Sequence, residues 1–203
     1  MVTYPERMDG WLEWQKKYRY GTLVLWPPDA VRQQVNALRQ RYDPESQRIC
    51  ETHITLTQPL LRGPTEVDWR ALQDVVAACS PFTIQYGPLG TFLPYPCIYY
   101  AIEPAQKVLA LRADVHATGL CNLSLPLTEG FVPHMSLNDG RPDEQATRAI
   151  YRDLTQNPPP NGAFHCHDVA YIVPDETFAF TVARRLPMAD EPTTLLQQPR
   201  EVP

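Results

Sequence analysis

The chain has 203 residues, of which 43% are hydrophobic and 10% aromatic, and its formal net charge at pH 7 is −5. This length and apolar content predict a folded protein that forms either one large domain or two small lobes. The acidic balance argues against a protein that coats long nucleic acid, because such binding depends on many cations that neutralise phosphates. A small nucleotide or an RNA end needs only a local positive site, so the charge does not exclude these ligands.

Three features of the sequence bear on where the protein works. The chain contains no apolar run of roughly 18 residues, so we expect no membrane span. Residues 1–19 lack the apolar core of a signal peptide, which favours a cytoplasmic protein. The cysteines are odd in number and show no CxxC spacing, so we expect reduced, buried thiols rather than disulfides or a zinc site. They are Cys50, Cys79, Cys97, Cys121 and Cys166.

The first half of the chain is expected to run strand, helix, strand, helix, strand. Alternating or continuous apolar runs predict the strands, and apolar residues that recur with a helical period predict the helices. Pro44 lies just beyond the end of the first helix, and residues 87–96 are rich in turn-forming residues. The expected elements are a strand over 21–26, a helix over 29–42, a strand over 53–57, a helix over 68–79 and a strand over 82–86.

The second half repeats this order and adds a final strand. Its expected elements are a strand over 98–102, a helix over 105–118, a strand around His134, a helix over 143–154 and strands over 164–173 and 178–186. A repeated order of elements is the pattern expected of two similar units. We therefore predict a domain over residues 20–188, with lobes of about 20–92 and 93–188 related by a pseudo-two-fold axis. Residues 1–19 form an N-terminal extension, and residues 189–203 form a tail that we expect to be disordered.

Two short strings stand at equivalent points of the two halves, His53-Ile54-Thr55-Leu56 and His134-Met135-Ser136-Leu137. Side chains of a strand alternate between faces, so each string places an imidazole and a hydroxyl on one face and two apolar side chains on the other. Two imidazoles can act as general base and general acid on a phosphate ester. One such string is weak evidence, since a histidine that bonds a backbone carbonyl in the core would look the same. The pair at equivalent positions favours a catalytic site.

With these two strings the chain resembles the two-histidine (2H) phosphoesterases, which include bacterial RNA 2′,3′-cyclic phosphodiesterases and 2′-5′ RNA ligase-like proteins. The resemblance covers about residues 20–187, and Gly63 after the first string matches a turn common in relatives. It implies an α+β fold, bilobal, with antiparallel-rich sheets and outer helices around a central cleft.

The same resemblance implies roles for the motif residues. His53 and His134 would flank the scissile phosphate, and Thr55 and Ser136 would hydrogen-bond its non-bridging oxygens. No metal or other cofactor is implied. Which histidine is the base depends on whether the product is a 2′- or a 3′-phosphate; we expect a 2′-phosphate, with His53 as acid and His134 as base.

Other residues could bind the substrate or a metal. Nucleobases stack on aromatic rings, and arginines meet phosphates. His165 and His167 form an H-x-H pair on one predicted strand, which could ligate zinc but is more typical of surface histidines. His116, late in a predicted helix, is expected to be structural. The candidate substrate-binding residues are Tyr171, Tyr99, Phe131, Phe92, Arg62 and Arg141.

The function predicted from the sequence is a metal-independent phosphodiesterase that hydrolyses 2′,3′-cyclic phosphates of RNA ends or small nucleotides. One alternative keeps the catalytic pair and changes the substrate to 2′-5′ linkages, cyclic oligonucleotide signals or cyclic ADP-ribose phosphates. Another is an inactive nucleotide- or RNA-binding module, although such a module has no chemical reason to keep both imidazoles. We expect a monomer that does not act at a membrane.

Overall fold

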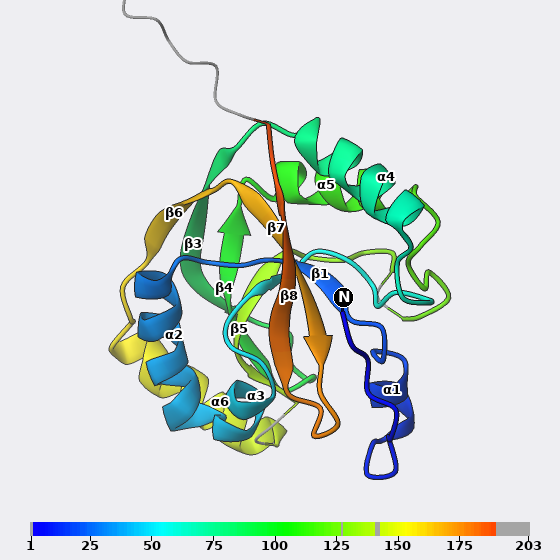
Figure 1. Ribbon diagram of the computed structural model, residues 1–203. Helices are drawn as coiled ribbons and strands as arrows, with labels where there is room; N and C mark the ends of the chain where they lie inside the picture. The colour runs from blue at the N-terminus through cyan, green and yellow to red at the C-terminus, as the bar shows by residue number, and fades with distance from the viewer. Residues whose placement is uncertain (1, 127, 141–142, 190–203) are drawn as a thin grey trace, which may run out of the picture.

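The computed structural model describes residues 2–126, 128–140 and 143–189, and it confirms the α+β class (Figure 1). Its helices and strands alternate along most of the chain. The helices are α1 (Glu13–Lys16), α2 (Asp29–Tyr42), α3 (Pro44–Ile49), α4 (Glu66–Ala77), α5 (Ala105–His116) and α6 (Glu144–Gln156). The strands are β1 (Thr22–Leu25), β2 (Ile54–Thr55), β3 (Phe82–Thr91), β4 (Cys97–Glu103), β5 (His134–Asp139), β6 (Gly162–Cys166), β7 (Asp168–Pro174) and β8 (Phe180–Pro187).

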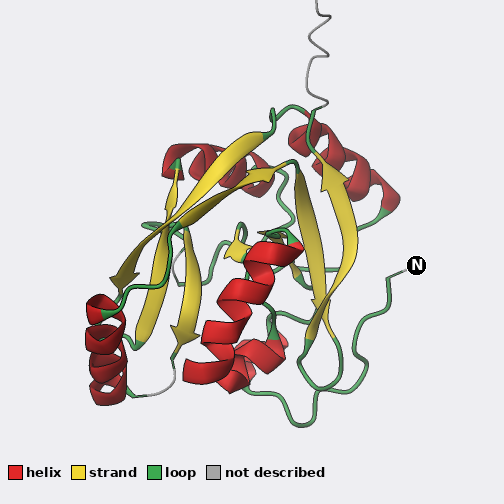
Figure 2. Cartoon of the chain, turned by 90° about the vertical axis from the view of Figure 1, so that its left-hand side faces the viewer, coloured by secondary structure: helices red, strands yellow, loops and turns green. Residues whose placement is uncertain are grey.

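The strands form two antiparallel sheets of four strands each. The first has the order β2-β1-β7-β8 and the second the order β5-β4-β3-β6. Helices α4 and α5 pack side by side over one end of the molecule, and Figure 2 shows the two sheets with a helix in front of the space between them. The short strand β2 and the strand β5 are both edge strands, and they contact each other.

The sheets do not follow the expected lobes of residues 20–92 and 93–188. Strand β3, from the first half of the chain, pairs with β4 and β6, whereas β7 and β8 return to pair with β1. The reason is a break in the strand expected over 164–173. The chain leaves the second sheet at Cys166 and enters the first at Asp168, so that His167 lies between β6 and β7. His165 and His167 therefore do not share a strand.

Several predicted boundaries also differ. Helix α2 ends at Tyr42, so Pro44 lies just beyond it as expected, but Pro44 also begins the unpredicted helix α3, which the Asp43 side chain caps by accepting a hydrogen bond from the Ser46 N–H at 3.0 Å. Strand β3 continues through the supposed turn region to Thr91, with a shift in its register after Tyr86. Local turn composition was overridden there by pairing with β4.

The alternation predicted for the two motifs is confirmed. The apolar members, Ile54, Leu56, Met135 and Leu137, are at most 1% exposed and belong to the main core. Their polar neighbours in each string are half-buried on the opposite face of the strand. The core therefore fixes the direction in which the imidazoles and hydroxyls point.

The remaining expectations concern thiols, the tail and the membrane. All five cysteines are free, and all except the partly exposed Cys79 are buried. Of the tail predicted over 189–203, only Ala189 lies within the described residues, and its N–H donates to the Cys79 oxygen at 3.0 Å. Among the described helices, none is both long and apolar enough to cross a membrane.

Candidate active site

Both motifs open onto one pocket of about 250 Å³, which is lined by His53, Thr55, His134 and Ser136. The order of the strands explains why the two motifs lie close together, since β2 and β5 are edge strands of different sheets and contact each other. Strand β5 presents His134 and Ser136 to the shared space, and β2 presents Thr55 together with His53, the residue that directly precedes the strand. Residues 81 positions apart in the sequence are thus brought together without any direct pairing of the two strands.

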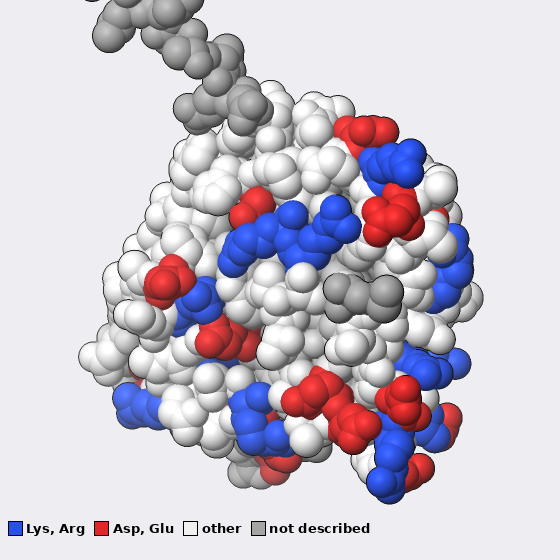
Figure 3. All heavy atoms as spheres, viewed as in Figure 1, with Lys and Arg blue, Asp and Glu red and all other residues white. Residues whose placement is uncertain are grey.

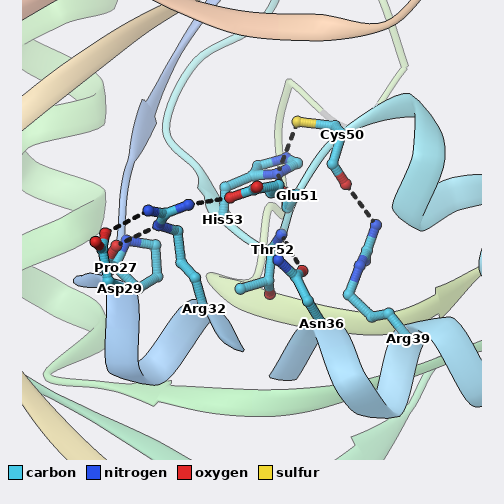
Figure 4. A network of polar contacts seen from close by, with 9 residues as sticks. All are labelled: Pro27, Asp29, Arg32, Asn36, Arg39, Cys50, Glu51, Thr52 and His53. Carbon is cyan, nitrogen blue, oxygen red and sulfur yellow. Dashed lines mark hydrogen bonds and ion pairs between the residues drawn. The ribbon is translucent and has the colours of Figure 1, made fainter. Parts of the chain in front are cut away.

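Helix α2 positions the loop that precedes His53 (Figure 4). The Asn36 Oδ1 accepts a hydrogen bond from the Thr52 N–H at 2.8 Å, and the Arg39 Nη2 donates to the Cys50 oxygen at 2.9 Å. Residues three and four apart lie on one side of a helix, so side chains on this side of α2 hydrogen-bond the loop at successive positions. The backbone ahead of the first motif is held by polar bonds rather than by a long strand.

Arg32, one helical turn before Asn36, contacts the same loop. Its guanidinium pairs with the carboxylates of Asp29 and Glu51 (Figure 4). The same guanidinium lies 5.3 Å from the centre of the Trp26 ring. The Trp26 ring in turn lies parallel to the His53 imidazole, with 6.4 Å between the ring centres. The His53 ring thus has an aromatic neighbour parallel to its face, in addition to the backbone bond made by its Nδ1.

The two imidazoles are held by the same kind of bond. The Nδ1 of His53 lies 2.8 Å from the Glu51 oxygen, and the Nδ1 of His134 lies 2.7 Å from the Val132 oxygen. A carbonyl oxygen only accepts, so Nδ1 carries the proton in each ring. Nε2 is then the nitrogen of each ring that is available for proton transfer.

Burial lowers the pKa of both histidines. For His53 the pKa falls to about 4; the backbone bond to Glu51 raises it, and the positive charge of Arg39 and the neighbouring His134 lower it further. For His134 burial also lowers the pKa, while the bond to Val132 and the negative charge of Asp139 raise it. Both rings are therefore neutral at pH 7 in the free protein, and only His134 has a carboxylate that favours its charged form.

Arg39 joins the two halves of the site and was missed in the sequence. It is 4% exposed, and besides Cys50 its guanidinium donates to the Ser136 oxygen at 2.9 Å, within the second motif. A signal was present, because Arg39 lies one helical turn after the buried Val35 on the apolar stripe of α2. A charged residue on such a stripe must have buried partners.

Aromatic side chains surround His134, and they include the candidate substrate-binding residues Tyr99, Phe131 and Phe92. Their ring centres lie 5.5, 5.9 and 5.0 Å from that of His134, and Phe92 stacks on Tyr99 at 4.2 Å. Phe92 and Phe131 line a second pocket of about 660 Å³, which shares Thr55 and His134 with the first. The two pockets form one continuous cleft.

Two of the other candidates do not reach this cleft. Tyr171 is wrong as a pocket wall, because its side chain is fully buried against Trp69 and its hydroxyl donates to the Tyr20 oxygen at 2.6 Å. Arg62 lines neither pocket, and its guanidinium pairs with Asp68. Arg141 lies outside the described residues.

The histidines outside the motifs have no such setting. The Nε2 of His116 accepts a bond from the Gln58 N–H at 3.3 Å, which agrees with the structural role expected for it. His165 and His167 are exposed. Within the described part of the chain, no group of three or more His, Cys, Asp or Glu side chains is placed to hold a metal ion.

Two edge strands that each present an imidazole and a hydroxyl to one pocket are the arrangement of the two-histidine phosphoesterases. The family described as the 2'-5' RNA ligase superfamily matches residues 27–177 of this chain. The chain belongs to this superfamily, and as a phosphoesterase it is a hydrolase that acts on phosphodiester bonds.

Similarity to individual proteins agrees with this assignment. A Bacillus cereus protein named "Putative phosphoesterase" is 27% identical over 133 residues, which cover 64% of this chain and 75% of the relative. Among solved structures, E. coli LigT complexed with 3'-AMP covers 83% of this chain and 97% of its own, with a TM-score of 0.54 and 15% identity. A Thermus thermophilus protein covers 84% of this chain and 98% of its own, with a TM-score of 0.55 and 17% identity. These structures share the fold.

Proposed function

We propose that this protein hydrolyses 2′,3′-cyclic phosphates at RNA ends or in small nucleotides, without a metal ion. The observation that carries the proposal is the matched setting of His53 and His134 in one pocket. Each imidazole has its Nδ1 fixed on a backbone oxygen, so that Nε2 can exchange a proton with a ligand. Proton transfer by positioned side chains contributes about 10²–10⁴-fold to such reactions.

In the proposed reaction, water attacks phosphorus while one imidazole takes its proton. The bond from phosphorus to one ribose oxygen breaks, and the other imidazole, in its protonated form, gives that oxygen a proton. The hydroxyls of Thr55 and Ser136 donate to the non-bridging oxygens, where negative charge grows in the transition state. The product is a phosphate monoester, and one proton has moved from water to the ribose.

The charges around the free site favour one division of roles. Asp139 stabilises the imidazolium form of His134, whereas Arg39 disfavours it for His53. We therefore propose His53 as base and His134 as acid, which is the reverse of the assignment expected from the sequence. The 2′-phosphate expected from the sequence goes with the opposite division of roles, so chromatography of the products against 2′-AMP and 3′-AMP separates the two: a 3′-phosphate supports His53 as base, and a 2′-phosphate supports His53 as acid.

The surroundings of the cleft support a nucleotide ligand. Aromatic rings beside His134 offer flat faces for a base. E. coli LigT has been solved with 3'-AMP and with NADP+, so a protein of this fold accepts nucleotides. On the face shown in Figure 3, basic side chains occur in small groups with acidic ones beside them. This pattern favours a short ligand over long RNA, as the net charge does.

The test is turnover of adenosine 2′,3′-cyclic phosphate in the presence of EDTA. We expect hydrolysis by the wild type and a loss of several orders of magnitude in His53→Ala and His134→Ala. His165→Ala is the matched control, since His165 is an exposed histidine outside both pockets. Near-wild-type turnover in either motif variant would remove the paired-imidazole mechanism. Binding without turnover would support the inactive module instead, and a strict need for added metal would point to a metallohydrolase.

A further inference from the structure

The N-terminal segment before β1 forms part of the pocket that holds the motif histidines. This segment precedes the region matched by the family, which begins at residue 27. Even so, Leu12, Trp14, Gln15 and Tyr18 line the same pocket as His53 and His134. Tyr18 also lines the second pocket and so lies where the two halves of the cleft join.

The segment is anchored by Trp11 on the hairpin that connects β7 and β8. The Trp11 side chain is buried, its Nε1–H donates to the Glu176 oxygen at 2.8 Å, and its ring meets Phe178 edge-on at 4.9 Å. Figure 1 shows α1 beside the end of this hairpin. The anchoring leaves the next turn of the segment free to face the cleft.

The hairpin is shaped to receive the segment. Phe178 has a φ of 65°, a conformation that costs energy for a residue with a bulky side chain and persists where the surroundings demand it. The Asp175 Oδ1 accepts from the N–H groups of Thr177 and Ala179 and holds this turn. As a result the Phe178 ring is buried at the centre of the aromatic cluster that it forms with Trp11, Trp14, Tyr18 and Phe180.

Trp14 is the member of this cluster whose side chain is exposed to solvent. Its ring stands edge-on to Phe178 at 5.4 Å and to Tyr18 at 6.2 Å, yet its side chain is 55% exposed. An indole that lines the pocket of the motif histidines, is held in place by neighbouring rings and stays more than half exposed provides a platform on which a flat ring can stack. A second set of flat rings lies beside His134, where Tyr99 of β4 stacks with Phe92, the residue that follows β3.

We propose that Trp14 and Tyr18 form a second nucleobase subsite, so that the preferred substrate carries two adjacent bases rather than one. This inference rests on the proposed function. One base would lie on the rings beside His134 and the other on the Trp14 platform, with the reacting phosphate at the histidines. In a dinucleotide joined by a 2′-5′ linkage that phosphate lies between the two nucleosides, whereas in one that ends in a 2′,3′-cyclic phosphate it is carried by the ribose of the terminal nucleoside. Two substrates offer this chemistry: a dinucleotide that ends in a 2′,3′-cyclic phosphate, and a dinucleotide joined by a 2′-5′ linkage.

The experiment compares the KM and kcat of adenosine 2′,3′-cyclic phosphate with those of both diadenosine substrates. One stacked base changes affinity by about 5- to 150-fold, so we expect the KM of the preferred dinucleotide to be lower than that of the mononucleotide by a factor in this range. The dinucleotide that shows this advantage identifies which source supplies the second base.

Two variants at Trp14 separate stacking from simple packing. Both Trp14→Phe and Trp14→Leu can cover Phe178, but only phenylalanine offers a ring to a base. We expect Trp14→Phe to keep most of the dinucleotide advantage, and Trp14→Leu to raise the KM of the dinucleotide toward that of the mononucleotide while its kcat is kept. Unchanged urea midpoints establish that both variants are folded.

Failure of this inference differs from failure of the proposed function. If the wild type hydrolyses mononucleotide and dinucleotides with equal KM, or if Trp14→Leu keeps the full advantage, the second subsite is refuted while the enzyme assignment stands. If no substrate is hydrolysed, the proposed function falls. In that case, tryptophan fluorescence quenching by the dinucleotides in the wild type and in Trp14→Phe still tests the platform. Equal quenching in both proteins would overturn it.

Discussion

Replacement of Arg39 by lysine tests how the two halves of the site are joined. The Arg39 guanidinium donates to three backbone oxygens, those of Ser46, Cys50 and Ser136, each at 2.9 Å. These oxygens belong to α3, to the loop before His53 and to β5. Because the side chain of Arg39 is almost fully buried, water cannot take over these bonds.

Lysine keeps the charge but presents a compact ammonium group instead of a planar fork, so we expect it to lose two of the three bonds. A hydrogen bond to a charged group contributes about 1.5–3 kcal/mol, and at the lower figure two lost bonds cost about 3 kcal/mol. Total stabilities are about 5–15 kcal/mol, so this loss is large. With a urea slope of about 1–3 kcal/mol per molar, the unfolding midpoint should fall by about 1–3 M.

Activity should fall as well, because the backbone on both sides of the pocket loses a shared support. A displacement of about 1 Å in a catalytic group can cost about 10²-fold in rate, so we expect kcat to decrease by about 10- to 100-fold. Arg41→Lys is the control, since Arg41 lies on the same helix, is 70% exposed and pairs only loosely with Asp153 at 4.0 Å. If the two variants had equal midpoints and equal kcat, the role assigned to Arg39 would be refuted.

Three further changes test the electrostatics and the hydroxyls. Asp139→Asn removes a carboxylate that raises the pKa of His134, so the alkaline limb of kcat/KM against pH, which reports loss of the acid, should move to lower pH; an unmoved limb would exclude Asp139 from this role. Thr55→Val keeps the shape of the side chain without its hydroxyl and should lower kcat by about 10²-fold, whereas a change in KM alone would contradict a transition-state contact. The pKa of His53 is lowered from 6.5 to about 4 on folding, so the unfolded chain takes up its proton first and the free energy of unfolding should fall as the pH drops through this window. Urea unfolding at several pH values should show that the free energy of unfolding depends less steeply on pH in His53→Gln than in the wild type. An equal dependence on pH in both proteins would show that His53 is not neutral in the fold.

The motif residues could be predicted because strand alternation is a local property. Two residues on each side of a histidine suffice to assign its face, and the buried Ile54 and Met135 confirm the assignment. The substrate walls were harder, because the face of a strand in the first sheet depends on a register that the sequence does not give. Tyr171 points to the core, whereas its neighbour Ile172 lines the pocket, so an offset of one residue separates a correct from a wrong prediction.

The repeated order of elements in the two halves of the chain did not predict which strands belong to which sheet. A polar residue, His167, interrupts an otherwise continuous apolar run, and nothing local distinguishes a bend within one strand from a crossing between two sheets. The crossing is settled by long-range pairing, in which β6 joins β3 and β7 joins β1. The two motifs therefore lie at equivalent edge positions, as the repeated order of elements predicts. The sheets, in contrast, each contain strands from both halves of the chain, because long-range pairing decides which strands join.

The chemistry and the specificity of this site come from different parts of the chain, and they differ in how well the sequence reveals them. Catalysis requires a particular residue type at a fixed place on a rigid strand, so its signature is short and shared with the family. A base platform requires only a flat ring that is held still, and Trp14 provides one through an anchor at Trp11 and the strained turn at Phe178. No motif encodes this arrangement, since its parts lie at opposite ends of the chain. Relatives that lack such a segment can keep the same paired imidazoles and still differ in the nucleotides they prefer.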